Sequence, residues 1–94
     1  MSTTTELVER ALAFCTPLRQ GDGLRKKELD DLQKAITKFC AEYADAEFIP
    51  KEAAKVLIEL IPIIDSSAFL YSGDEAEEIR KASASLFDLI LSEL

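Results

Sequence analysis

Between Leu24 and Ala44, apolar side chains recur at spacings of three and four residues, the period of one face of an α-helix. The residues on this face are Leu29, Leu32, Ile36, Phe39, Cys40 and Tyr43. Lysine and aspartate side chains fall on the opposite face, so the segment is amphipathic. Comparable spacing occurs in 5–18, where Val8, Leu12 and Cys15 share a face. It occurs again from Ser72 to Leu94, where the predicted buried face consists of Ile79, Ala82, Ser83, Leu86, Phe87, Ile90 and Leu94. The chain is therefore predicted to be helical.

Residues that break helices are scarce. The 94 residues include three glycines and three prolines, too few for the many turns of a multi-stranded β protein. The first break is Gln20–Gly23, a third helix is predicted to begin near Pro50, and Ser72–Asp74 precedes a fourth. We expect one all-α domain spanning residues 1–94, an up-down antiparallel four-helix bundle with short connections.

The third predicted helix contains a proline. Pro62 lies within a dense apolar run, lacks a backbone donor and would clash with the carbonyl group of Ile58. We therefore expect a kink or a break at Pro62. A break would give a five-helix alternative, with a separate short helix from Ile63 to Tyr71.

The residue types needed for common catalytic and metal sites are largely missing. The chain has no histidine, so Ser-His and Cys-His nucleophile pairs are excluded. Two cysteines cannot form a zinc site of four cysteines, and no phosphate-binding glycine loop or calcium-loop spacing occurs. We expect a protein that is not an enzyme and that uses no cofactor and no metal.

The net charge is −7, and residues 52–94 contribute nine acidic and three basic side chains to it. This charge disfavours nucleic acid and anionic membrane surfaces, and it permits a basic protein partner. The apolar run from Val56 to Ile64 is far shorter than a bilayer span, so no membrane insertion is expected. A polar start from Met1 to Glu6 and two cysteines without a CxxC motif favour a cytoplasmic location with buried free thiols.

Four large aliphatic residues exceed what one buried stripe of a small bundle needs: Ile58, Ile63, Leu89 and Leu91. Successive helical residues are about 100° apart, so neighbouring apolar residues cannot all face one core. The excess predicts a homodimer face or a groove for a protein partner. A third helix enclosed on all sides is the other interpretation.

The segment from Gly21 to Lys27 carries three cations, Arg25, Lys26 and Lys27, at the start of the second helix. Cations oppose the helix dipole there, whereas free backbone N–H groups beside them can hold a phosphate or a carboxylate. A flexible loop with solvated charges is the other interpretation.

These features lead to two hypotheses of function. The first is a non-catalytic protein–protein interaction module, in its narrower form an immunity or inhibitor protein that binds a basic partner. The alternative is a small-molecule or anion sensor that uses the Gly21–Lys27 segment at the start of the second helix.

Overall fold

Four α-helices and one 3-10 helix form the part of the chain that the computed structural model describes, residues 2–94. Met1, the first residue of the polar start, lies outside this range. The elements in chain order are α1 (Thr3–Arg19), α2 (Lys26–Glu42), α3 (Lys51–Ser67), the 3-10 helix η1 (Ala68–Leu70) and α4 (Gly73–Glu93). Residues 2–94 contain no β-strand, which confirms the all-α four-helix bundle.

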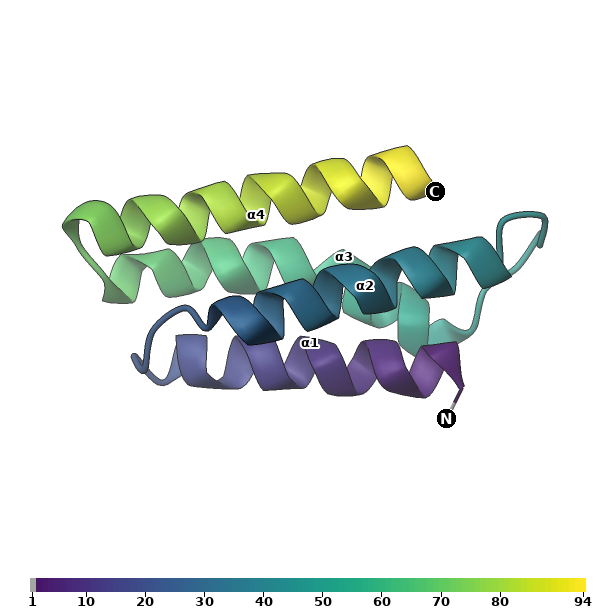
Figure 1. Cartoon of the computed structure of the whole chain (residues 1–94), viewed down its shortest axis with the longest axis horizontal. Helices are drawn as coiled ribbons and strands as arrows, with labels where there is room; N and C mark the ends of the chain where they lie inside the picture. The colour runs from purple at the N-terminus through teal and green to yellow at the C-terminus, as the bar shows by residue number, and fades with distance from the viewer. Residues whose placement is uncertain (1) are drawn as a thin grey trace.

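Consecutive helices alternate in direction, as predicted (Figure 1). The hairpins α1–α2 and α3–α4 are antiparallel pairs, and they pack side by side through α1 against α3 and α2 against α4. Both of these contacts join helices that run in the same direction. Consequently α2 and α3 lie diagonally across the bundle although they are consecutive, and residues 43–50 cross from one hairpin to the other.

All four helices contribute to one core. Its largest fully buried side chains are Leu7, Phe14, Leu18, Leu32, Ile36, Phe39, Leu60, Ile64, Ile79 and Leu86. In α2 the expected face is correct, since Leu32, Ile36, Phe39 and Cys40 are all buried. In α1 it is rotated, because Leu7 and Phe14 fill the core while Leu12 is exposed. No helix within residues 2–94 is long and apolar enough to cross a membrane.

Of the kink or break predicted at Pro62, the break was wrong, since α3 continues through this residue as far as Ser67. Pro62 is exposed, and so is Ile58, whose carbonyl group loses its helical partner and can bind water instead. The separate helix expected from Ile63 to Tyr71 is replaced by the end of α3 and the single turn of η1. Pro17 is likewise accommodated inside α1, which ends two residues later at Arg19.

Candidate interaction surface

A hydrogen bond between side chains aligns α3 with α4. Ser83 Oγ, which is buried, donates to Asp65 Oδ1 at 2.6 Å. Seven residues are close to two helical turns, so the side of α3 that carries Asp65 also carries Ile58. By the same periodicity Phe87 and Ile90 lie on the side of α4 that carries Ser83. Because the helices are antiparallel, Ile58 lies opposite the turn of α4 that contains Phe87 and Ile90.

The α3–α4 seam is bordered by large apolar side chains that the bundle does not cover. Ile58 is 74% exposed, and on α4 Phe87, Leu91 and Leu94 are 49%, 62% and 68% exposed. Phe87, Leu91 and Leu94 follow one another at spacings of four and three, so they form one stripe along α4. We call Ile58, Phe87, Leu91 and Leu94 the seam patch. It contains four of the eight exposed large apolar side chains within residues 2–94.

Two residues of the seam patch correct an expectation from the sequence. The apolar spacing of the fourth helix predicts that Phe87 and Leu94 lie on its buried face. Both are exposed, because the buried side of α4 is a narrower stripe that includes Ile79, Leu86 and Ile90. The spacing of Phe87, Leu91 and Leu94 was the available signal for a second apolar stripe.

The four residues predicted to bind a partner do not lie on one surface. Ile58 and Leu91 both border the α3–α4 seam. Ile63, half-buried, lies with Val8 and Leu12 in a groove between α1 and α3. Leu89, also half-buried, lies in a groove between α2 and α4. Helical geometry explains the separation, since five residues from Ile58 to Ile63 turn the helix by about 140°.

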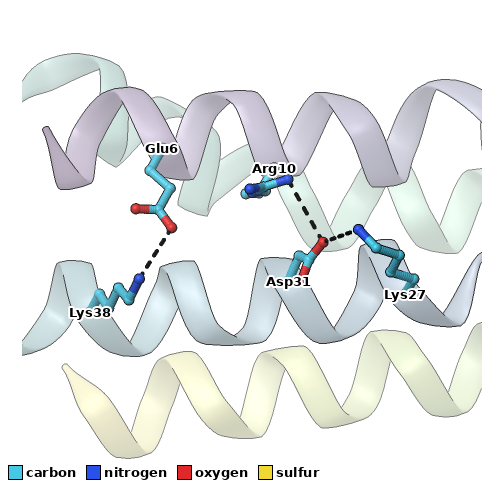
Figure 2. Close-up of polar contacts among 5 residues, drawn as sticks. All are labelled: Glu6, Arg10, Lys27, Asp31 and Lys38. Carbon is cyan, nitrogen blue, oxygen red and sulfur yellow. Dashed lines mark hydrogen bonds and ion pairs between the residues drawn. The ribbon is translucent and has the colours of Figure 1, made fainter. Parts of the chain in front are cut away.

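The three cations predicted to bind an anion have different surroundings. Lys27 Nζ donates to Asp31 Oδ2 at 3.1 Å, and Arg10 of α1 lies 3.7 Å from the same oxygen (Figure 2). The hydrogen bond from Lys27 is the main reason why the pKa of Asp31 is lowered, with the charges of Lys27 and Arg10 contributing. Arg25 and Lys26 are exposed, and within residues 2–94 neither forms an ion pair.

The glycine turn beside these cations is held by contacts within the chain. Gly21 and Gly23 have φ values of +81° and +97°, which side chains rarely tolerate. The N–H group of Gly23 donates to the hydroxyl oxygen of Tyr71 at 2.8 Å. A Cβ atom on Gly23 would lie 3.6 Å from Glu75 Oε2, so a carboxylate already approaches this turn. One backbone donor of the predicted anion site is therefore occupied.

Both thiols are free and lie in the core, as Cys15 and Cys40 are buried. Burial raises the pKa of the Cys15 thiol to about 11, and the nearby Arg19 partly offsets this effect. Burial also raises the pKa of Cys40, with a further contribution from the charge of Glu93. Protonated, enclosed thiols of this kind are poor nucleophiles.

No family model, no curated protein and no solved structure matches this chain.

Proposed function

We propose that the protein is a non-catalytic protein–protein interaction module and that the seam patch is its binding surface. The observation that carries this proposal is the joint exposure of Ile58, Phe87, Leu91 and Leu94 along one helix seam. Together these side chains expose on the order of a few hundred Å², the size of apolar patch that is often functional in a monomer. Such a patch can form the apolar centre of an interface of about 800 Å² per partner.

Charge favours a basic partner. Residues 52–94, which supply nearly all of the α3–α4 hairpin, carry a net charge of −6. A field of this sign accelerates the approach of a basic protein and rejects acidic ones. The narrower form of the proposal is an immunity- or inhibitor-type protein that neutralises such a partner.

A second copy of the chain is the other candidate occupant. Two acidic hairpins repel each other, so self-association through the seam patch should strengthen as added salt screens the repulsion. Binding of a basic partner should weaken under the same change. Sedimentation of the protein at high micromolar concentration, in low and in high salt, therefore separates the two occupants.

Affinity capture from the native cell tests the proposal. The bait is compared with the double variant Ile58→Lys/Leu91→Lys and with the control Leu12→Lys/Leu70→Lys. The control replaces two exposed apolar residues elsewhere and changes the charge equally. We expect a basic protein to be retained by wild type and control, lost by the seam variant, and eluted by salt. Retention by the seam variant would contradict the proposal. The proposal would also be contradicted if no protein were captured specifically and the wild type sedimented as a monomer in both low and high salt.

A further inference from the structure

An open groove of about 810 Å³ runs between the parallel helices α2 and α4, away from the seam patch. Its α2 wall extends from Asp30 to Lys38 and its α4 wall from Ser85 to Ser92. A second hollow of about 380 Å³ shares Asp30, Gln33 and Ser85 with it and extends the α2 wall back to Lys26. The 13 residues from Lys26 to Lys38 span about 18 Å of helix, or somewhat more than three turns.

Opposite charges lie on the two walls without meeting. In the smaller hollow, Lys26 and Asp30 line the α2 wall, and Glu78 and Lys81 line the α4 wall opposite. In the larger groove, Lys34 lines the α2 wall and Asp88 lines the α4 wall opposite. Within residues 2–94, no ion pair shorter than 4.0 Å crosses the groove. These charges are therefore open to an occupant that lies between the walls.

The floor of the groove suits the close approach of another helix. Leu29 and Leu89 are half-buried there and present apolar surface. The α4 wall also carries the small residues Ala82, Ser85 and Ser92. Small side chains allow a neighbouring backbone to come near, and a half-buried leucine gives it something to cover.

The secondary structure of the occupant follows from hydrogen bonding. Apart from the first turn of α2 and the last turn of α4, both walls are helices whose backbone groups are already paired within the helix. An extended peptide would find few partners here for its own N–H and C=O groups, whereas a helix satisfies them internally.

We propose that the α2–α4 groove binds an amphipathic helix of a partner protein. The apolar stripe of that helix covers Leu29 and Leu89, an acidic flank lies against Lys34, and a basic flank lies against Asp88. This site is distinct from the seam patch, so it stands independently of the function proposed above.

Three helical peptides of about 15 residues test the proposal; all carry leucine at positions i, i+3, i+4 and i+7. One has an acidic and a basic flank, one has two acidic flanks, and one has two basic flanks. Fluorescence anisotropy should show the mixed peptide binding about tenfold more tightly than either of the others. With Asp88→Lys the groove should prefer the peptide with two acidic flanks. With Lys34→Glu it should prefer the peptide with two basic flanks. A preference order that neither substitution changes would overturn the proposal.

Adjacent tryptophan substitutions test the location. Ser85→Trp fills the groove, while Ala84→Trp places the same side chain at an exposed neighbouring position that does not line it. We expect Ser85→Trp to abolish binding of the mixed peptide and Ala84→Trp to leave it unchanged, with unaltered circular dichroism in both. Equal binding by the two variants would overturn the proposal, as would binding lost in Leu91→Ser and retained in Ser85→Trp.

Discussion

The hydroxyl group of Tyr71, at the end of η1, donates to the carbonyl oxygen of Leu18, in the last turn of α1, at 2.9 Å. The same hydroxyl oxygen accepts from the N–H group of Gly23, 48 residues away in sequence. One side chain thus joins the end of the first helix, the glycine turn and the connection between α3 and α4. A partly buried hydroxyl with a donor and an acceptor is a costly group to remove.

Tyr71→Phe should lower the free energy of unfolding by about 1–3 kcal/mol, because it leaves the Leu18 carbonyl and the Gly23 N–H without this partner. Urea unfolding monitored by circular dichroism measures the change. Tyr43→Phe is the matched control, since the Tyr43 ring stacks on Phe39 and its hydroxyl bonds to no other residue within 2–94. The control should be close to neutral, and equal losses in both variants would contradict the role given to Tyr71.

Two phenylalanines should respond oppositely to truncation. Phe39 is 0% exposed and Phe69 is 87% exposed. Phe39→Ala should cost about 3–5 kcal/mol, since it removes buried contacts and leaves a cavity. Phe69→Ala should change stability by less than about 0.5 kcal/mol. Thermal and urea unfolding of the two variants check this, and a large loss for Phe69→Ala would mean that η1 is covered in solution.

Pro62→Ala should stabilise the protein by about 1–3 kcal/mol. The substitution restores a backbone donor to the Ile58 carbonyl within α3 and removes the ring from an otherwise continuous helix. Loss of the proline also increases the entropy of the unfolded chain, which sets the lower end of the range. A melting temperature below that of the wild type would show that the proline contributes something α3 needs.

Alkaline pH should destabilise the fold through its buried thiols. The pKa of Cys15 rises from 9.0 to about 11 on folding, so between these values the unfolded chain releases a proton that the folded chain retains. Stability is therefore complete below about pH 9 and declines as the pH approaches 11. Because lysine and tyrosine also titrate there, the measurement is the difference in slope between wild type and Cys15→Ala. Identical slopes would contradict the burial of this thiol.

The helices could be predicted from the sequence because their signals are local. Turn glycines and apolar periodicity each act within a few residues, and the face of Leu32, Ile36 and Phe39 followed from spacing alone. The break predicted at Pro62 does not occur, because the cost of a proline depends on whether the carbonyl group that it frees can meet water. That depends on tertiary structure, which leaves Ile58 exposed here.

The candidate surface was only partly within reach of the sequence. Ile58 and Leu91 were identified as excess apolar residues, and both remain exposed. Ile63 and Leu89 were grouped with them, but each is half-buried beside a different helix. Short connections suggest that consecutive helices pack together, and this rule fails for α2 and α3. The grooves depend on that diagonal arrangement, which no local spacing encodes.

The crossing made by residues 43–50 also joins two units, the hairpins α1–α2 and α3–α4, which share one core. Because α2 and α3 do not pack against each other, this connection orders no interface between the helices that it joins. Each unit is a hairpin closed by its own short turn, and the two recognise each other through α1–α3 and α2–α4. Extending the connection would cost only about 0.6 kcal/mol for each doubling of its length. A cleavage between Asp45 and Glu47 should therefore yield two fragments that reassemble as a heterodimer, with an apparent stability that depends on their concentration.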